Sequence, residues 1–298
     1  MGTRMENVSI FCPGKINLTL AVTGRRSDGY HDLVSLVVPI QLGDELKVRR
    51  VSQEGILLKM SGEPAPSGGE NLVVKAANRF IERFPGEDGG LVFELHKNIP
   101  SGAGLGGGSS DAAGALLALN ELSGCPADTE SMNELALGLG SDCPLFLHRR
   151  PVIVRGRGER IEALPAERER ELRGRRLLVF KPFFGVSTGW AYRELARRGA
   201  YSKPAAVEEG LDAWKKGTVS AEGIMRNDFE DVVGSKYLAI RVLLRELRER
   251  FGIPVHMSGS GSACFALLRE EGSGGEVAES VREAFGAEGF CTETGIVW

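Results

Sequence analysis

The chain lacks the features of a membrane or disulfide-stabilised protein. No stretch of its 298 residues approaches the roughly 18 uncharged apolar residues that a membrane-spanning helix needs. The amino-terminal segment also lacks the apolar core of a secretory signal peptide. The five cysteines are scattered and form no C-x-x-C pair, which excludes the usual zinc and redox-dithiol motifs. We therefore expect a cytoplasmic protein with reduced cysteines, and we assign no function to residues 1–4.

An excess of charge of one sign is also missing. The formal net charge is −3 although charged residues make up 26% of the chain. This balance gives no reason to expect binding to nucleic acid or to a membrane surface, and it favours small-molecule partners. Internal repeats are absent, and the length together with 42% hydrophobic residues is sufficient for two ordinary domains.

Short β-branched runs and helical patterns alternate along the chain, which predicts an α+β fold. Strands are expected at 8–24, 33–42, 44–51, 55–62 and 90–99, and later at 176–182, 254–259, 262–268 and 294–298. An apolar strand is also expected directly after Asp142. Helices are expected at 70–84, 111–124, 131–140, 187–197, 204–216, 236–251 and 275–287. We place a domain boundary so that residues 1–165 and 166–298 form separate domains.

Glycine and serine are concentrated in residues 101–110, immediately before an alanine-rich and leucine-rich helix. Backbone N–H groups without side-chain obstruction, followed by a helix N-terminus, form a typical anion site. Ser109 and Ser110 at the helix start are candidates for capping free N–H groups or for binding a nucleotide-associated Mg²⁺. The alternative is a glycine-rich turn that exists for conformational reasons alone.

Three common phosphate-binding motifs do not fit this segment. A Walker A loop needs a lysine followed by serine or threonine after the last glycine, and none is present here. A Rossmann fingerprint needs an acidic residue at the end of the next strand, whereas Glu121 falls inside the helical run. A protein-kinase loop needs V-A-I-K and H-R-D partners, which are missing. A phosphate cradle of another type remains.

Candidate charged residues that could act together with such a phosphate-binding loop lie elsewhere in the chain. Lys15 lies in an apolar strand, where it is either a surface lysine or a functional cation. Asp142 follows two glycine-punctuated turns and is either a helix cap or a base. Gly259 and Gly261 lie between two strand-like runs, as either a bulge or a second backbone-lined binding edge.

Three motifs in this order resemble those of the GHMP small-molecule kinases: PGKINLTL at 13–20, IPSGAGLGGGSSDAAGAL at 99–116 and MSGSGSACFAL at 257–267. Within that superfamily, GRRSDGYHDL at 24–33 and GSDCPLFL at 140–147 resemble the branch that phosphorylates a cytidyl-linked polyol for non-mevalonate isoprenoid synthesis. Gly14 departs from the pattern, because the family often has alanine there.

The resemblance implies a ribosomal-protein-S5 domain 2-like N-terminal domain and a ferredoxin-like C-terminal domain. It implies Lys15 and Asp142 as the catalytic pair, and Asn17, Tyr30 and His31 as contacts of the cytidyl substrate. ATP with Mg²⁺ would be the co-substrate, and its phosphates would be held by Pro100, Ser101, Gly102, Ala103, Gly104, Leu105, Gly106, Gly107, Gly108, Ser109 and Ser110. The metal ligands and the oligomeric state are not assigned, and residues 71–77 are a candidate lining of the adenine pocket.

Two other hypotheses stay open. Another GHMP kinase, acting on homoserine, mevalonate or galactose, would have no cytosine to recognise, so the SDGYH sequence at 27–31 argues against it. A non-catalytic nucleotide-binding protein on the same fold would be expected to have lost Lys15 or Asp142, and both are present.

Overall fold

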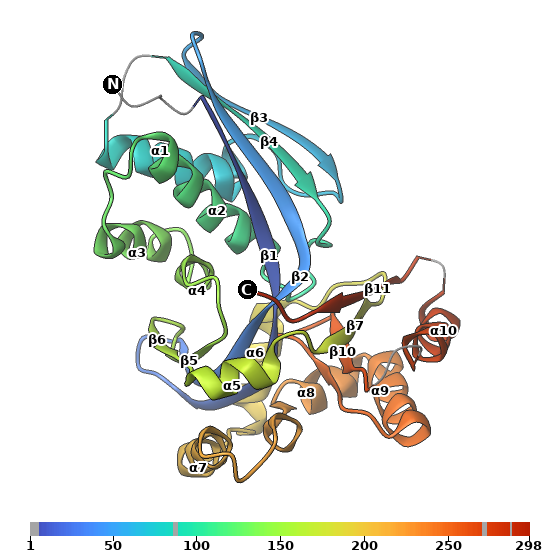
Figure 1. Cartoon of the computed structure of the whole chain (residues 1–298). Helices are drawn as coiled ribbons and strands as arrows, with labels where there is room; N and C mark the ends of the chain where they lie inside the picture. Colours follow the sequence, from blue (N-terminus) through green and yellow to red (C-terminus); the bar gives the residue numbers. More distant parts are fainter. Residues whose placement is uncertain (1–5, 86–88, 270–272, 287) are drawn as a thin grey trace. The chain divides into compact units, whose positions relative to one another are not determined.

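The computed structural model of the chain describes residues 6–85, 89–269, 273–286 and 288–298, so residues 1–4 lie outside the described part (Figure 1). The strands are β1 (Asn7–Arg25), β2 (His31–Val51), β3 (Gly55–Gly62), β4 (Gly90–Lys97), β5 (Val152–Gly156), β6 (Arg160–Ala163), β7 (Arg176–Lys181), β8 (Arg226–Asn227), β9 (Val255–Met257), β10 (Cys264–Leu267) and β11 (Phe290–Gly295).

Helices fall between these strands, as expected for an α+β protein. They are α1 (Leu72–Arg83), α2 (Gly107–Leu122), α3 (Thr129–Leu137), α4 (Cys143–Leu147), α5 (Ala166–Leu172), α6 (Thr188–Arg198), α7 (Pro204–Lys215), α8 (Glu230–Lys236), α9 (Leu238–Phe251) and α10 (Ser273–Phe285), with short 3₁₀ turns at Gly68–Glu70 and Ala221–Ile224. Within the described ranges, none of the helices combines the length and the apolar character needed to cross a bilayer.

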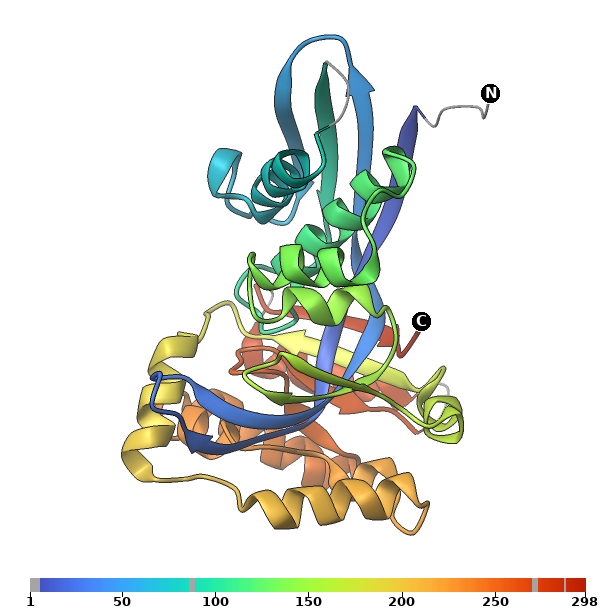
Figure 2. The same cartoon turned by 90° about the vertical axis from the view of Figure 1, so that its left-hand side faces the viewer.

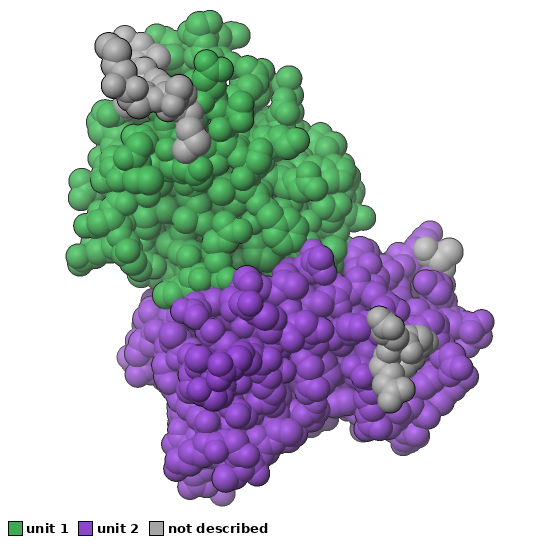
Figure 3. Space-filling model, viewed as in Figure 1, with its two compact units in different colours: residues 1–14, 42–101, 106–149 green, residues 15–41, 102–105, 150–298 purple. Residues whose placement is uncertain are grey.

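The chain divides into two compact units, shown in different colours in Figure 3. Unit 1 contains residues 1–14, 42–101 and 106–149, and unit 2 contains residues 15–41, 102–105 and 150–298. The long strands β1 and β2 therefore contribute residues to both units. The boundary between 165 and 166 stays a prediction.

Unit 1 packs helices against a sheet. Strand β4 pairs in parallel with β3 and antiparallel with the second half of β2. Helices α1 and α2 lie against each other and cover one face of these strands (Figures 1 and 2). Phe80 of α1, Phe93 of β4 and Leu116 of α2 are buried in the shared core.

Unit 2 contains a four-stranded antiparallel sheet in the order β11-β7-β10-β9. Helices α9 and α10 pack on it, and their apolar side chains share a core with Leu178, Val255 and Ala266 of the sheet. The chain order β7, α9, β9, β10, α10, β11 with this strand order is the split βαβ arrangement of ferredoxin-like domains. The predicted fold of the C-terminal part is confirmed. In the rest of unit 2, β5 pairs with the first half of β2 and with β6, and β8 pairs in parallel with β1.

At two places the strand boundaries differ from the prediction. The strands predicted at 33–42 and 44–51 form one continuous strand, β2. Gly43, which suggested a turn, lies inside this strand. A Cβ at this position would come within 2.7 Å of the Cys12 carbonyl oxygen, so the glycine is explained by close packing. The last strand, β11, lies at 290–295 rather than 294–298. It is an edge strand with half-buried side chains, so its threonines and glutamate hide it from a search for apolar runs.

Three predictions about helices need correction. Helix α2 begins at Gly107 rather than at residue 111. The segment after Asp142 forms the short helix α4 instead of a strand, with Pro144 in its first turn, where proline is well tolerated. The helix predicted at 236–251 is preceded by a separate helix, α8, which ends before the non-helical Tyr237.

Candidate active site

Lys15 is a buried lysine of unit 2, and only 6% of its surface is exposed. Its Nζ donates hydrogen bonds to Asn17 Oδ1 at 2.7 Å and to the Gly104 carbonyl oxygen at 2.7 Å. Its backbone N–H donates to the Leu105 carbonyl at 2.9 Å. This burial excludes the surface-lysine alternative, because a snorkelling lysine keeps its ammonium group in water.

Asn17 connects the first motif to the third. Its Oδ1 accepts hydrogen bonds from Lys15 Nζ and from the Gly259 N–H, the latter at 3.0 Å. Its Nδ2 donates to Ser35 Oγ at 2.8 Å, and this hydroxyl donates onward to the Thr19 carbonyl at 2.6 Å. The amide of Asn17 is therefore held in one orientation by β1 and β2, with its oxygen toward Lys15.

The second and third motifs meet backbone to backbone within unit 2. Gly104 has φ +83°, and a Cβ on it would lie 2.6 Å from the Ser258 carbonyl oxygen. The Ala263 N–H donates to the Ala103 carbonyl at 2.9 Å. A Cβ on Gly259 would lie 3.4 Å from Lys15 Nζ. The third motif is thus a backbone-lined edge packed against the second motif. Lys15 hydrogen-bonds the second motif directly and is linked to the third through Asn17.

The remainder of the glycine-rich segment forms the N-terminus of α2 in unit 1. Gly106 is the N-cap with φ 75°, and it offers no side chain, so the N–H groups of the first turn are available to an anion. Capping of the helix by Ser109 or Ser110, one of the two expected roles, is not observed, because both residues lie inside α2. Ser109 hydrogen-bonds the thiol of Cys143, and burial raises the pKa of that thiol to about 11 in spite of this bond.

Asp142 occupies the N-cap position of α4 in unit 1, but its carboxylate makes no capping hydrogen bond. The cap alternative is therefore not realised. Asp142 is exposed, in contrast to the buried Cys143 that follows it. Lys15 and Asp142 are assigned to different units, so their pairing remains a prediction.

His31 is the first residue of β2 and Tyr30 directly precedes it, in unit 2. Tyr30 is 53% exposed, and the Arg157 guanidinium lies 3.6 Å from its ring centroid. The His31 ring lies 4.9 Å from the Tyr192 ring and 6.1 Å from the Tyr201 ring, measured between centroids. Its Nε2 is buried, with no hydrogen-bond partner in the described part of the chain. Burial, assisted by the charge of Arg25, lowers the pKa of His31 and favours the neutral imidazole.

Two residues near these groups escaped the sequence analysis. Tyr192 of α6 contacts His31, and its only signal was an aromatic residue within an ordinary helical pattern. Asn227 donates from Nδ2 to the Met257 carbonyl at 2.8 Å and to the Gly259 carbonyl at 2.9 Å. It therefore holds the backbone of the third motif, although no spacing in the sequence connects residue 227 with residue 259.

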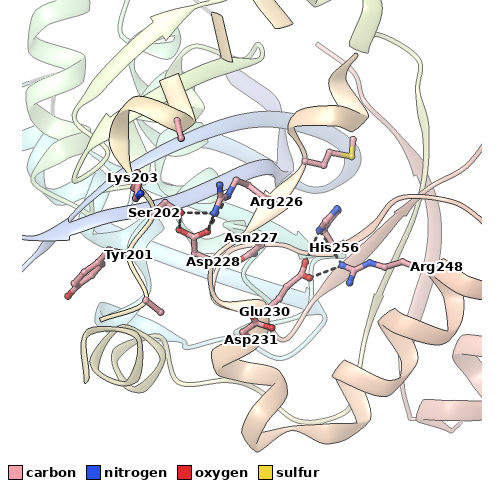
Figure 4. A pocket seen from close by; sticks show the side chains of 13 residues that line it. Tyr201, Ser202, Lys203, Arg226, Asn227, Asp228, Glu230, Asp231, Arg248 and His256 are labelled. Atoms are coloured by element: carbon pink, nitrogen blue, oxygen red, sulfur yellow. Dashed lines mark hydrogen bonds and ion pairs between the residues drawn. The ribbon is translucent and has the colours of Figure 1, made fainter. Parts of the chain in front are cut away.

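A cavity of about 530 Å³ opens in unit 2, and Tyr201, which lies near His31, is one of its lining residues (Figure 4). The other lining residues include Glu230, Arg248 and His256. The Glu230 carboxylate accepts from His256 Nδ1 at 2.8 Å, from Arg248 at 2.7 Å and from the Met257 N–H at 3.0 Å. Burial opposes ionisation of Glu230, but these partners outweigh it and lower its pKa. Glu230, Arg248 and His256 are thus engaged in fixing strand β9, which leads into the third motif.

All five cysteines are thiols, as the sequence predicts. Cys12, Cys143 and Cys264 are buried, and burial raises the pKa of each, which makes them unreactive packing residues. The candidate adenine residue Asn71 caps α1, because its Oδ1 accepts from the Val73 N–H at 2.9 Å.

Comparison with known proteins identifies the family. Residues 71–150 match the GHMP kinases N terminal domain and residues 204–287 match the GHMP kinases C terminal domain. A 4-diphosphocytidyl-2-C-methyl-D-erythritol kinase from Methylacidiphilum infernorum is 38% identical over 272 residues, which are 89% of this chain and 87% of the relative. The corresponding enzyme from Prochlorococcus marinus strain MIT 9313 is 36% identical over 95% of this chain and 91% of the relative.

Solved structures agree with this assignment. A crystal structure of 4-(cytidine 5'-diphospho)-2C-methyl-D-erythritol kinase is 36% identical, covers 97% of this chain and 99% of its own, and superposes with a TM-score of 0.76. A homoserine kinase from Cytophaga hutchinsonii is 16% identical with a TM-score of 0.72 over 99% of this chain and 96% of its own, and it shares the fold. The chain belongs to the 4-diphosphocytidyl-2-C-methyl-D-erythritol kinase family of the GHMP kinases.

Proposed function

We propose that the chain transfers the γ-phosphoryl group of ATP to the 2-hydroxyl of 4-diphosphocytidyl-2-C-methyl-D-erythritol. The observation that carries this proposal is the environment of Lys15, a buried cation that hydrogen-bonds Asn17 of the first GHMP motif and Gly104 of the second. The same Asn17 oxygen accepts from Gly259 of the third motif, so one hydrogen-bond network includes all three motifs. Phosphoryl transfer asks a protein mainly for positioning and for compensation of negative charge, and a fixed buried ammonium group supplies both.

The segment Pro100–Ser110 is the proposed cradle for the ATP phosphates. Gly102, Gly104 and Gly106 all have positive φ, so their N–H groups adopt orientations that residues with side chains rarely reach. The unpaired N–H groups of the first turn of α2 add a positive dipole end. These features support anion binding by the backbone in a segment that has no lysine of its own.

In the proposed reaction, the carboxylate of Asp142 accepts the proton of the substrate 2-hydroxyl. The hydroxyl oxygen then bonds to the γ-phosphorus, while the bond from that phosphorus to the β–γ bridging oxygen breaks and ADP leaves with the electron pair. Lys15 orients the Asp142 carboxylate and stabilises the developing negative charge. A tertiary alcohol is a poor nucleophile, so removal of its proton is a reasonable requirement.

Mg²⁺ fits this site as an ion held mainly by the nucleotide. Among the described residues, no three acidic, histidine or cysteine side chains gather into a metal site. Ser110 fits as one protein ligand, because its buried Oγ has no hydrogen-bond partner in the described part of the chain. When bound, Mg²⁺ would neutralise charge on the phosphate oxygens.

Tyr30, His31 and Asn17 are the proposed contacts of the substrate. The exposed ring of Tyr30 offers a face on which a cytosine can stack. The neutral His31 ring carries an unpartnered Nε2, judged from the described residues, which suits a hydrogen bond to the edge of a base. Tyr192, packed against His31, would fix the orientation of that ring.

An ADP-release assay with three acceptors tests the function. We expect kcat/KM for the cytidyl substrate to exceed the values for homoserine and mevalonate by about 10³-fold or more, because a site that hydrogen-bonds a base rejects acceptors that lack it. Preference for homoserine or mevalonate would assign the chain to another GHMP activity. ATP binding without ADP release for any acceptor would make it a non-catalytic nucleotide-binding protein.

Replacement of Asp142 by Asn tests the proposed base. We expect kcat to fall about 10²-fold to 10⁴-fold, as for loss of a general base, while the affinity for ATP stays unchanged. Asp128→Asn is a matched control, because Asp128 is an exposed N-cap in the same unit and asparagine caps equally well. Full turnover by the Asp142 variant would contradict the assigned role.

Replacement of Gly104 by Ala tests the cradle. The new Cβ would clash with the Ser258 carbonyl, and φ +83° would be strained, so we expect ATP affinity to fall by about tenfold or more. Gly199→Ala is the control, because Gly199 has φ +61° at the end of α6 but a Cβ on it would meet no atom within 4 Å. Equal ATP affinities in both variants, measured by calorimetry, would count against the cradle.

A further inference from the structure

Lys97 is a second buried lysine, in unit 1, and the proposed reaction does not use it. It ends strand β4, and its ammonium group lies between the carboxylates of Asp44 and Asp111. Lys97 Nζ donates to Asp111 Oδ2 at 2.6 Å and also donates to Asp44 Oδ2. Each of these three side chains is at most 4% exposed. We call these three residues the buried triad.

Asp44 ties the triad to the chain segment that enters the glycine-rich loop. Its Oδ1 accepts hydrogen bonds from the Asn98 N–H at 2.6 Å and from the Ile99 N–H at 2.9 Å. Asn98 Nδ2 donates in turn to the Gly43 carbonyl at 2.8 Å. The two residues that precede Pro100 are therefore fixed by one carboxylate of β2.

Asp111 ties the triad to the segment that leaves the loop. It lies one turn into α2, directly after Ser109 and Ser110. A Cβ on Gly107 would lie 3.0 Å from Ile99 Cγ2 and 3.3 Å from Lys97 Nζ, so both side chains lie against the first turn of the helix. The closeness of this contact explains why residue 107 is a glycine although it is helical.

The polar groups of the triad are not fully satisfied, which argues against a purely stabilising role. One ammonium group is shared by two buried carboxyl groups, and Asp111 Oδ1 has no hydrogen-bond partner within the described ranges. Buried ion pairs contribute little net stability compared with apolar packing, because desolvation of the charges is costly. What the triad provides is a fixed geometry between the entry to the glycine-rich loop and its exit.

We propose that Lys97 is a positioning residue that, through Asp44 and Asp111, holds the two ends of the phosphate-binding loop and so sets the affinity for ATP. The role of the loop itself rests on the proposed function. Since Lys97 lies behind the first turn of α2, its loss should affect nucleotide binding more than binding of the cytidyl substrate, whose proposed contacts Tyr30 and His31 belong to unit 2.

The test compares dissociation constants for a non-hydrolysable ATP analogue and for the cytidyl substrate, measured by calorimetry on the full chain. We expect Lys97→Met and Asp111→Leu to weaken binding of the analogue by about tenfold or more, with substrate affinity within about twofold of wild type. Asp111→Asn should bind the analogue within about threefold of wild type, since its amide oxygen still accepts from Lys97. Lys59→Met, which removes an exposed lysine from the neighbouring strand, is the control.

Two results would overturn the proposal. One is an unchanged affinity of Lys97→Met and Asp111→Leu for the analogue, and the other is an equal loss of affinity for both ligands. If Lys97→Met does not fold, the comparison of Asp111→Leu with Asp111→Asn decides between these outcomes. Because the assay measures binding without turnover, failure of the proposed kinase function would appear separately, as analogue binding by a wild-type chain that phosphorylates no acceptor.

Discussion

Asn17 is the residue that brings Lys15 and the third motif together, since one amide oxygen accepts from both. Lys15 and Asn17 could be predicted as site residues from the sequence, because both belong to a short motif that resembles a known family. It could not show that Asn17 binds Lys15, because the contact depends on the alternation of side chains along β1 and on Ser35 of the neighbouring strand.

Substitutions at Asn17 and Ser35 should separate these roles. We expect Asn17→Leu to reduce kcat by about 10²-fold, because Lys15 loses a buried acceptor and Gly259 loses its partner. Ser35→Ala should reduce kcat by only about threefold to tenfold, because it removes the support of the amide and leaves the amide itself. Steady-state kinetics on both variants checks which substitution lowers kcat more. A larger reduction of kcat in Ser35→Ala than in Asn17→Leu would contradict the roles assigned to these two residues.

Asp111 should make stability depend on pH. Burial raises the pKa of Asp111 to about 7, although Lys97 opposes this, and the groups that face it are Lys97, Asp44 and Cys12. The folded chain thus holds a proton that the unfolded chain releases near the ordinary value of 3.8. The contribution of this proton to the free energy of unfolding is fully present below pH 3.8, the ordinary pKa of aspartate, and it is lost as the pH rises to about 7.

The matching measurement is the melting temperature between pH 4 and pH 8 for wild type and Asp111→Asn. The variant should not show the loss of stability that deprotonation of Asp111 causes in wild type as the pH rises. At pH 8 it should be as stable as wild type or more stable, because Lys97 then faces only one charged carboxylate. The difference between the free energies of unfolding of the two proteins should change by up to about 4 kcal/mol across this pH range, since each pKa unit corresponds to about 1.4 kcal/mol. Parallel curves for the two proteins would show that Asp111 does not titrate in this way.

Helix α2 was predicted as a helix, but its first residue was predicted wrongly. Its alanine and leucine pattern predicted a helix, yet the start was placed four residues late, because glycine and serine disfavour helix interiors. Tertiary packing overrides that propensity: Gly107 lies against Ile99 and Lys97, and Gly114 lies against Cys12. These contacts involve residues outside the helix, and Cys12 is far from Gly114 in the sequence, so no helical pattern reveals them.

Replacement of Gly114 by Ala tests this packing. Alanine in a helix interior normally stabilises by about 1 kcal/mol, but here its Cβ would lie 2.4 Å from Cys12 Sγ, so we expect a loss of about 1–3 kcal/mol. The double variant Gly114→Ala with Cys12→Ala should recover most of that loss, because the new methyl group occupies the space of the thiol. Denaturant unfolding of both single variants and the double variant measures the coupling, and its absence would contradict the packing argument.

At the scale of the whole molecule, sequence patterns predicted the α+β class, and the resemblance to the GHMP kinases predicted the ferredoxin-like part, which the order of elements from β7 to β11 confirms. The division into units was less accessible, because β1 and β2 are continuous strands that contribute to both. The proposed catalytic groups are divided in the same way, with Lys15 in unit 2 and Asp142 in unit 1. Activity should therefore require the complete chain.

The proposed reaction moves a phosphoryl group to the hydroxyl on the methyl-bearing carbon of the substrate. Phosphorus NMR of a reaction with ATP, Mg²⁺ and the cytidyl substrate tests it directly. We predict one new phosphomonoester for each ADP formed, with no coupling to a carbinol proton, because that carbon carries a methyl group in place of hydrogen. Inorganic phosphate instead of an ester, or an ester coupled to a proton on its carbon, would contradict the account.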